Sequence, residues 1–381
     1  MSASATPGRL AIVLLALLAA SCGNSSDTPP PTPVPTPTSA PQPIAAMPLA
    51  VAGNLVGVNR REWIVVVRAA GGGNADPLGT VVLPPDAGPG AGPLPVPGCP
   101  LLDAPPGCTA QGTIMSVGET DWTYGQTIFI TPSDFRVPIE EAFGPLGEVV
   151  DLAAFAAGDV VNDVRPGPGP IFIGTEPHFS AQLPAHRPVY WPAPGIARVP
   201  LPAGGFAAGP VPKQADAQQR IVGEGLDPVL PVLWLPGADG YALQLLALLD
   251  GGGQGGARGI DDGLIVGWSA DASGSTHAVL WTLADAGVAL QTLPVPVAAV
   301  SCTQAVGISG PRIAGECVAA DGAVLAVVWA RVDAATWTVA ATLAPLPGDV
   351  AAHPVGISGD LVVGTSEHGV LPRANVAWRL P

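Results

Sequence analysis

Three stretches of the C-terminal half decide the fold: residues 259–267 read GIDDGLIVG, residues 307–315 read GISGPRIAG and residues 356–364 read GISGDLVVG. In each stretch the first and last glycines are eight positions apart. A short apolar segment follows each stretch and ends in a tryptophan, and Trp281, Trp329 and Trp378 lie 48 and 49 residues apart. A unit that recurs about every 45–50 residues is typical of a repeat architecture.

The repeat extends toward the N-terminus in four further copies. Each copy has apolar residues before a glycine and then a second apolar segment. The copies are RIVG (220–223) before Trp234, IFIG (171–174) before Trp191, and the fainter IMSVG (114–118) before TIFI (127–130) and NLVG (54–57) before WIVVV (63–67). Seven repeats are therefore predicted, with key glycines at positions 57, 118, 174, 223, 267, 315 and 364.

Each repeat is predicted to form four short strands separated by Gly, Asp, Ser and Pro turns. In the clearest copy these strands are residues 256–260, 263–268, 277–282 and 288–293. Four strands at this period are typical of a propeller blade. An amphipathic helical pattern is found only at residues 140–157.

The predicted fold is an all-β β-propeller of seven four-stranded blades. The last repeat ends at Pro381 after its third strand, so one strand is missing there. Residues 43–49 resemble that strand, and we expect them to complete the last blade and close the ring. Closure would remove a sheet edge that invites aggregation.

The N-terminus is predicted to be a lipoprotein signal peptide, residues 1–21. Arg9 precedes an apolar run at 10–20 that is too short to span a bilayer of about 30 Å. The small residues before Cys22 resemble a bacterial lipobox, in which the cysteine is lipidated, although the usual leucine stands one place further back. An ordinary secretory signal cleaved nearby is the alternative. Either interpretation predicts export to the bacterial cell envelope, facing the periplasm or the cell surface.

The mature chain is predicted to have two parts. Residues 22–43 begin with Cys22 and are rich in proline and threonine, which favours an extended polyproline II tether. Residues 44–381 form the propeller domain. An insertion at residues 85–112 would explain why the first repeat interval is 61 residues long.

The other cysteines form two pairs that are close in the sequence, Cys99 with Cys108 and Cys302 with Cys317. A two-residue turn at Ser309-Gly310 would place opposite each other residues whose numbers sum to 619, as 302 and 317 do. Both pairs are predicted to be disulfides of an oxidising compartment. Their spacing does not resemble a zinc site.

The charge composition excludes one class of partner. Only 12% of the 381 residues are charged, the net charge is −15, and Lys213 is the single lysine. Nucleic-acid binding needs clustered cations, so no nucleic-acid partner is expected.

The repeat unit, G-I-[DS]-[DG]-x-x-[IV]-[AV]-G followed by A-x-x-W, resembles the extracellular HAF repeats of exported bacterial proteins. The resemblance covers about residues 44–381 and is strongest from 211 onward. It implies an exported protein with a β-propeller or closely related β-repeat fold. It supplies no catalytic residue to carry over, so it implies location and fold rather than chemistry.

No catalytic set, metal site or cofactor is predicted. The GTSEHG segment around Ser366 has His368 where a hydrolase elbow needs glycine. Asp261-Asp262 is interpreted as a hairpin turn and Glu140-Glu141 as part of a solvated connection. The five histidines form no HxH or HExxH motif. Metal binding by His178 and His186 is left open as the less favoured interpretation.

Two groups of tryptophans are distinguished by their place in the repeat. Trp122, Trp268 and Trp337 depart from the periodic position and are candidates for exposed aromatic contacts. The others recur at one strand position and are interpreted as core between blades: Trp191, Trp234, Trp281, Trp329 and Trp378.

Polar residues of several repeats are predicted to converge on the central channel, because the first strand of a blade lines it. The candidate ligand-binding residues are Lys213, Asp216, Arg258, Gln304 and His353. An ordinary solvated channel lining is the alternative, since every propeller has one.

The leading hypothesis for function is a lipid-anchored, non-catalytic binding or scaffold module for an envelope protein or glycan. It would contact the membrane through its N-terminal lipid only, and its oligomeric state is not predicted. The rival is a glycan-directed hydrolase or lyase with carboxylates at the channel mouth. Two or more carboxylates with a histidine in one pocket would favour the enzyme, whereas a lining of glutamine, threonine and backbone would favour the binder. A purely structural envelope component is the third possibility.

Overall fold

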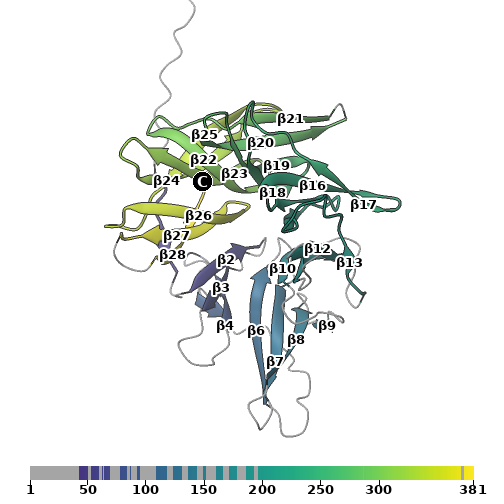
Figure 1. Ribbon diagram of the computed structural model, residues 1–381. Coiled ribbons are helices and arrows are strands. Elements are labelled where there is room, and N and C mark those ends of the chain that lie inside the picture. Colours follow the sequence, from purple (N-terminus) through teal and green to yellow (C-terminus); the bar gives the residue numbers. More distant parts are fainter. Residues whose placement is uncertain are drawn as a thin grey trace, which may run out of the picture. The chain divides into compact units, whose positions relative to one another are not determined.

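The structure is a computed structural model, shown in Figure 1. It describes residues 43–49, 53–59, 62, 64–68, 78–83, 86, 92–94, 109–117, 123–130, 136–143, 149–151, 160–165, 171–177, 186–192, 196–285, 287–369 and 373–381. All of these residues belong to one compact unit, Ala40–Pro381. The described residues form strands and no helix.

Seven antiparallel sheets of four strands, called blades 1 to 7, account for these strands. Blade 1 consists of β2 (Asn54–Val58), β3 (Ile64–Arg68), β4 (Leu78–Leu83) and β5 (Gly92–Leu94). Blade 2 consists of β6 (Thr109–Val117), β7 (Thr123–Ile130), β8 (Arg136–Phe143) and β9 (Val149–Asp151). Blade 3 consists of β10 (Val160–Arg165), β11 (Ile171–Pro177), β12 (His186–Trp191) and β13 (Val199–Pro200). Blade 4 consists of β14 (Val211–Ala215), β15 (Ile221–Gly225), β16 (Leu230–Gly237) and β17 (Gly240–Leu245). Blade 5 consists of β18 (Gly255–Asp261), β19 (Leu264–Ala270), β20 (Thr276–Ala284) and β21 (Gly287–Thr292). Blade 6 consists of β22 (Ala299–Ser309), β23 (Arg312–Ala319), β24 (Val324–Arg331) and β25 (Trp337–Leu343). Blade 7 consists of β26 (Ala351–Ser358), β27 (Leu361–Glu367), β28 (Ala374–Arg379) and β1 (Met47–Pro48).

The blades form a closed ring. The first strand of each blade contacts the first strand of the next, in the order β2, β6, β10, β14, β18, β22 and β26, and β26 contacts β2 again. The N-terminal strand β1 completes blade 7, because Met47 pairs with Ala377 and Pro48 with Val376. The prediction of a seven-bladed propeller closed by an N-terminal strand is confirmed.

The recurring tryptophans form the contacts between blades. All five are fully buried, and the clusters around Trp234, Trp281, Trp329 and Trp378 combine residues of two neighbouring blades, as where Trp329 packs against Val266 and Leu280. Four of their indole N–H groups donate to a backbone carbonyl in the segment after the fourth strand of the preceding blade. These bonds are Trp234 to Pro202 (2.8 Å), Trp281 to Ala247 (2.7 Å), Trp329 to Pro294 (2.7 Å) and Trp378 to Ala344 (2.8 Å).

Every first strand contains a one-residue irregularity at the same place. The pairing between the first and second strands shifts by one residue there, and the extra residues are Val56, Met115, Asn162, Lys213, Arg258, Val306 and Val355. Such a β-bulge bends the strand and re-aims a side chain. The bulge positions are therefore equivalent points around the inner ring of strands.

The glycine of the repeat is explained by a close approach of two backbones beside this bulge. A Cβ atom on the second-strand glycine would lie 2.2 Å from the carbonyl oxygen of Val211 at Gly223, and 2.3 Å from that of Gln304 at Gly315. Gly267 and Gly364 have equivalent contacts, at 2.0 and 2.2 Å. In these four blades no side chain fits at this position without moving the first strand.

The two N-terminal repeats are one strand out of register with the prediction. Residues 54–57 lie in first strand β2, and residues 114–117 lie in first strand β6. The second strand of blade 2 is β7, and its repeat glycine is Gly125, which pairs with Ile114 just before the bulge. In blade 1 the equivalent residue of the second strand is Val66, which pairs with Leu55. Both first and second strands contain apolar residues before a glycine, so the motif alone does not distinguish them.

Three smaller expectations need correction. The helical pattern at residues 140–157 instead covers the end of β8 and all of β9, so Glu140-Glu141 lies in a strand and not in a connection. Trp337 is 5% exposed and packs in the core between blades 5 and 6, so it offers no surface contact. Strand β5 and the start of β6 fall within residues 85–112, most of which lie outside the described residues.

Cys302 and Cys317 form the predicted disulfide. The turn lies one residue later than expected, because Ser309 pairs with Arg312. Two register shifts, one before Gly307 and one before Gln304, then bring Cys302 opposite Cys317. Cys22, Cys99, Cys108 and the segment 1–42 lie outside the described residues.

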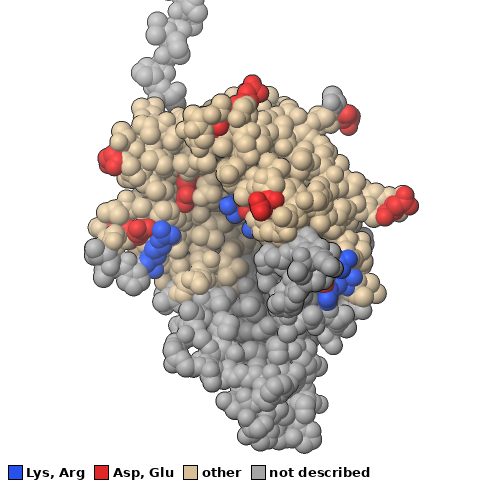
Figure 2. All heavy atoms as spheres, viewed as in Figure 1, with Lys and Arg blue, Asp and Glu red and all other residues tan. Residues whose placement is uncertain are grey.

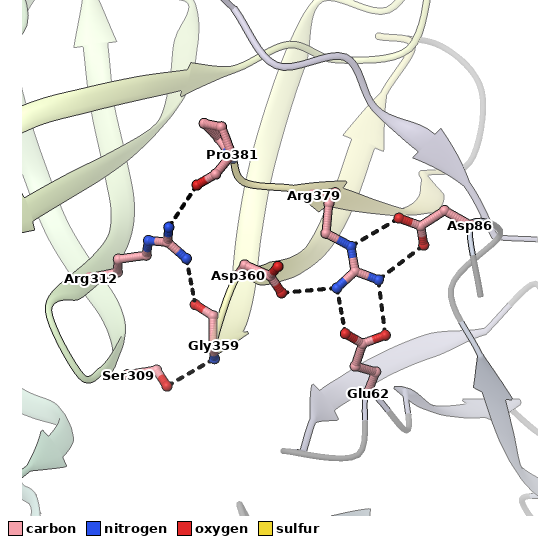
Figure 3. A network of polar contacts seen from close by, with 8 residues as sticks. All are labelled: Glu62, Asp86, Ser309, Arg312, Gly359, Asp360, Arg379 and Pro381. Atoms are coloured by element: carbon pink, nitrogen blue, oxygen red, sulfur yellow. Dashed lines mark hydrogen bonds and ion pairs between the residues drawn. The ribbon is translucent and has the colours of Figure 1, made fainter.

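A set of polar contacts joins the last blade to its neighbours (Figure 3). Arg379 of β28 bonds Glu62, which lies between β2 and β3, and also Asp86 (Nε to Oδ2, 2.9 Å) and Asp360 (2.9 Å). Its side-chain bond to Asp86, together with the positive charge, holds the pKa of that carboxyl below its usual value against the opposing effect of burial. In the same view Arg312 of blade 6 donates to the carbonyl of Pro381 (2.8 Å). These contacts lie at the seam that closes the ring.

Candidate ligand-binding site

The predicted channel residues fall into three places. Lys213 and Arg258 are the bulge residues of blades 4 and 5. Gln304 and His353 lie two positions before the bulges of blades 6 and 7. Asp216 lies beyond the end of β14, in the turn to β15.

Asp216 stabilises that turn and does not join the others. It is 1% exposed, and its Oδ1 accepts the backbone N–H groups of Gln218 and Arg220, both at 3.0 Å. Its Oδ2 accepts from Arg220 Nε at 2.6 Å. All of these bonds are local, so the prediction of Asp216 as a ligand-binding residue is not supported by its contacts.

Gln304 and His353 meet at Glu316, which directly follows the repeat glycine of blade 6. Gln304 Nε2 donates to Glu316 Oε2 at 2.8 Å, and His353 Nδ1 lies 3.0 Å from Glu316 Oε1. The other imidazole nitrogen lies 3.2 Å from Glu367 Oε2, to which Arg373 Nε donates at 2.9 Å. Side chains of blades 6 and 7 thus form one continuous polar group, called the Glu316 cluster.

Charges in the Glu316 cluster reinforce each other. The hydrogen bond to Glu316 raises the pKa of His353 above its ordinary 6.5, against the opposing effect of burial. Burial alone would raise the pKa of Glu316, but the bonds from His353 and Gln304 outweigh it, and the pKa falls below the ordinary 4.5. Near pH 6 the pair is therefore carboxylate and imidazolium.

A cavity of about 700 Å³ opens beside this cluster, where blades 6, 7 and 1 meet. Its walls carry both polar and apolar groups: Gly53, Asn54, Leu55, Glu316, His353, Pro354, Val355, Thr365, Arg373 and Asn375. Asn375 Nδ2 donates to the carbonyl of Gly53 at 3.0 Å and so ties blade 7 to the start of blade 1. The volume lies within the range of about 300–1,000 Å³ that is usual for ligand sites.

Lys213 and Arg258 meet at a second glutamate. Glu224 directly follows the repeat glycine of blade 4 and is 7% exposed. Lys213 Nζ lies 3.7 Å from its Oε2, and Arg258 Nη2 of the next blade lies 3.1 Å from its Oε1. Trp268 is partly buried and donates its indole N–H to Oε1 at 3.2 Å. These four residues are called the Glu224 cluster.

The sequence interpretation missed the carboxylates on which both clusters centre. Glu224 and Glu316 occupy one repeat position, the residue after the second-strand glycine. Alignment of the repeats on that glycine would have identified both. For Glu367 and Arg373, alignment of the repeats gives no such signal.

Other sequence candidates have local roles. Ser366 is buried, and its Oγ accepts the backbone N–H of Leu346 at 2.8 Å, so it supports a loop. Asp262 (φ 44°) and Gly263 (φ 79°) form the hairpin turn predicted for Asp261-Asp262. Among the described residues no group of three or more His, Cys, Asp or Glu side chains is placed to hold a metal ion. His178 lies outside the described residues, and the backbone of His186 lies in β12.

Comparison with known proteins bears on the fold alone. No protein-family model matches the chain, and a search of curated proteins finds no relative. Among solved structures, a prolyl endopeptidase aligns with a TM-score of 0.51 and 15% identity, over 85% of this chain and 46% of its own. The chain therefore spans about half the length of that peptidase. At this identity the likeness supports the propeller architecture and carries no activity with it.

Two other propellers align over most of both chains. The β-propeller domain of the Trilobed protease from Pyrococcus furiosus has 10% identity and a TM-score of 0.44, over 89% of this chain and 95% of its own. The BP39L lectin from Burkholderia pseudomallei has 13% identity and a TM-score of 0.42, over 89% of this chain and 96% of its own.

In the part of the chain that the structure describes, no helix is long and apolar enough to cross a membrane.

Proposed function

We propose that this protein is a non-catalytic binding module of the bacterial cell envelope that takes a glycan into the cavity between blades 6, 7 and 1. The observation that carries the proposal is the lining of that cavity. Asn54, Thr365 and Arg373 offer hydrogen-bond donors and acceptors, while Leu55 and Val355 offer apolar surface. Sugars present hydroxyl groups that both donate and accept, together with apolar C–H faces, so this mixture suits them.

The rival hypothesis, a glycan-directed enzyme, would be favoured by two or more carboxylates with a histidine in one pocket. The Glu316 cluster has that composition, since it joins two carboxylates and a histidine. Its contacts argue against catalysis. The lowered pKa of Glu316 keeps that carboxyl ionised near neutral pH, where it is a poor proton donor and a weak base. Each group is already bound to a partner. A glycan-directed hydrolase or lyase that uses Glu316, His353 and Glu367 is the second candidate.

The envelope location belongs to the proposal. Its support is the apolar run before Cys22, the Pro/Thr-rich segment 22–43 and the resemblance to HAF repeats. A lipid on Cys22 would anchor the chain, and an extended tether would hold the propeller away from the membrane.

The test uses the full-length lipoprotein, purified in detergent, and a panel of neutral and acidic envelope glycans. A ligand that binds only the native state raises the unfolding midpoint by mass action. We expect one class of glycan to raise it, and Arg373→Ala to remove the shift. Arg331→Ala is the matched control, because that exposed arginine ends β24 and its side chain donates to the carbonyls of Asp333 and Ala334 in the turn to β25.

Two outcomes would contradict the proposed function. If no glycan shifts the midpoint of the folded protein, a protein partner or a structural role replaces it, and cross-linking on intact cells separates these two. If a glycan is cleaved and Glu316→Gln abolishes cleavage, the enzyme hypothesis replaces it.

A further inference from the structure

Lys213 and Arg258 lie at the repeat position that lines the cavity in blade 7. Both are bulge residues, as is Val355, which is part of the cavity wall. The inner strands β14, β18, β22 and β26 contact one another in sequence around the ring. The two cations therefore lie at the same level of the inner ring as the cavity, Arg258 in blade 5, next to blade 6, and Lys213 one blade further, in blade 4.

The Glu224 cluster carries an excess positive charge. Glu224 is the only carboxylate among the described residues that forms an ion pair with Lys213 or Arg258. One carboxylate neutralises one of the two cations. The side chains of Lys213 and Arg258 are 31% and 35% exposed, whereas that of Glu224 is 10% exposed. The free charge is thus on the solvent side of the cluster.

The cations are held in place from behind. The indole of Trp268 donates to Glu224, and a Cβ atom on Gly256 would lie 2.1 Å from Glu224 Oε1, so the carboxylate lies against the backbone of the next blade. Arg258 Nε is buried and has no hydrogen-bond partner among the described residues. Burial and the neighbouring Arg258 lower the pKa of Lys213, against the opposing effect of Glu224. Among the described residues this pair of cations has no second anion.

We infer that Lys213 and Arg258 form an anion subsite that binds a carboxylate of the glycan, so that the ligand class is acidic, uronate-type glycans. The inference rests on the proposed function and specifies its ligand. An ammonium and a guanidinium form strong, charge-assisted hydrogen bonds to a carboxylate. The net charge of −15 does not oppose this locally, because charges beyond about 8 Å are screened at physiological salt.

The test compares two probes with the same sugar backbone, an oligogalacturonate and its fully methyl-esterified form, in which uncharged methyl esters replace the carboxylates. Calorimetric titration of the full-length protein should show the acid binding at least about tenfold more tightly than the ester. The double variant Lys213→Gln, Arg258→Gln should remove that preference, and Arg331→Gln should keep it. The preference should also weaken with added salt, because it is electrostatic.

The outcomes separate the two proposals. Equal affinity for acid and ester would overturn the anion subsite and leave the glycan-binding function standing. No binding of either probe would also overturn the subsite, and the neutral glycans of the panel would then decide the function independently. If the double variant is destabilised, Lys213→Gln alone carries the test, since Lys213 makes the longer contact with Glu224. A preference unchanged in a folded variant would contradict the assignment.

Discussion

Glu224 and Glu316 occupy the same position in two repeats but have partners of different chemistry. Glu224 binds a lysine and an arginine, whereas Glu316 binds an amide and an imidazole. The difference depends on the bulge residues, which are Lys213 and Arg258 in blades 4 and 5 but Val306 and Val355 in blades 6 and 7. It also depends on the position two residues before the bulge of the next blade. In blade 7 this is His353, whose ring lies against Glu316. In blade 5 it is Gly256, and the carboxylate of Glu224 fills the space that a side chain would take.

The comparison teaches that the repeat determines where the glutamate lies and that the first-strand residues of two adjacent blades determine the charge of the cluster. On the face shown in Figure 2, acidic side chains lie mainly on separate projecting tips, and basic side chains lie in a few places only. In a chain with so few charges, two clusters of charged residues on the first and second strands of their blades stand out from the rest of the surface.

The most damaging change would remove the geometry that both clusters share. Gly315→Ala and Gly223→Ala should each destabilise the protein by about 3 kcal/mol, because the new Cβ would overlap a first-strand carbonyl. Denaturant unfolding measures this effect. Gly253→Ala is the control, since nothing lies within 4 Å of a Cβ there. Unfolding of Gly315→Ala within about 0.5 kcal/mol of the wild type would contradict the close-approach explanation.

The next change separates the two glutamates. Glu224→Gln should destabilise by about 2 kcal/mol, because it leaves two partly buried cations side by side without their carboxylate. Glu316→Gln should cost about 1 kcal/mol, since an amide can still bond Gln304 and a neutral His353. Chemical denaturation of both variants near neutral pH compares them. Equal losses would mean that the excess positive charge of the Glu224 cluster has no energetic effect.

A third change tests the seam of the ring, where three carboxylates share one cation. Arg379→Gln should destabilise by about 1 kcal/mol, since the groups around it are largely exposed. Arg331→Gln is again the control. Thermal unfolding should show a lower midpoint for Arg379→Gln only. A midpoint equal to that of the wild type would mean that these contacts do not stabilise the closed ring.

The smallest effect is the pH dependence that distinguishes the clusters. The pKa of His353 is raised, so its contribution is complete below pH 6.5 and is lost as the pH rises through the folded-state value. The pKa of Glu316 is lowered, so its contribution is complete above pH 4.5 and is lost as the pH falls through its folded-state value. The stability difference between wild type and His353→Gln should therefore be greatest between pH 4.5 and 6.5.

Measurement of that difference at several pH values, beside the same series for Glu224→Gln, checks the contrast. The Glu224 cluster contains no histidine, so its contribution should change less between about pH 6 and 8. If both series fall together over that range, the titrating group is not His353.

The C-terminal repeats could be predicted closely because each blade is a local structure. The strands expected at residues 256–260, 263–268, 277–282 and 288–293 lie within about two residues of β18 to β21. The core role of the five periodic tryptophans was also predictable. The N-terminal blades were misregistered because Val66 stands where the other repeats have glycine, and apolar residues before a glycine also occur in first strands.

The candidate site was less predictable, because its residues meet between blades. Lys213, Arg258, Gln304 and His353 were identified from the sequence, but their carboxylate partners were not. His353 and Glu316 are 37 residues apart, and the ring closes residues 53–55 onto residues 353–355 and 373–375. Asp216 looked equivalent to the others in the sequence and proved to be a turn residue.

By itself the sequence determined the number of blades, the closing strand, the Cys302 to Cys317 disulfide and the position of the interblade tryptophans. These features follow from the short-range pattern of apolar residues, glycines and tryptophans and from its regular period, and both can be read directly from the sequence. Only the tertiary structure decided that Glu224 and Glu316 become the centres of two clusters, and that one is paired with fixed cations and the other with a titrating histidine. The physical reason is that each contact joins side chains of neighbouring blades, and their distance depends on bulges and close backbone approaches that no local pattern specifies.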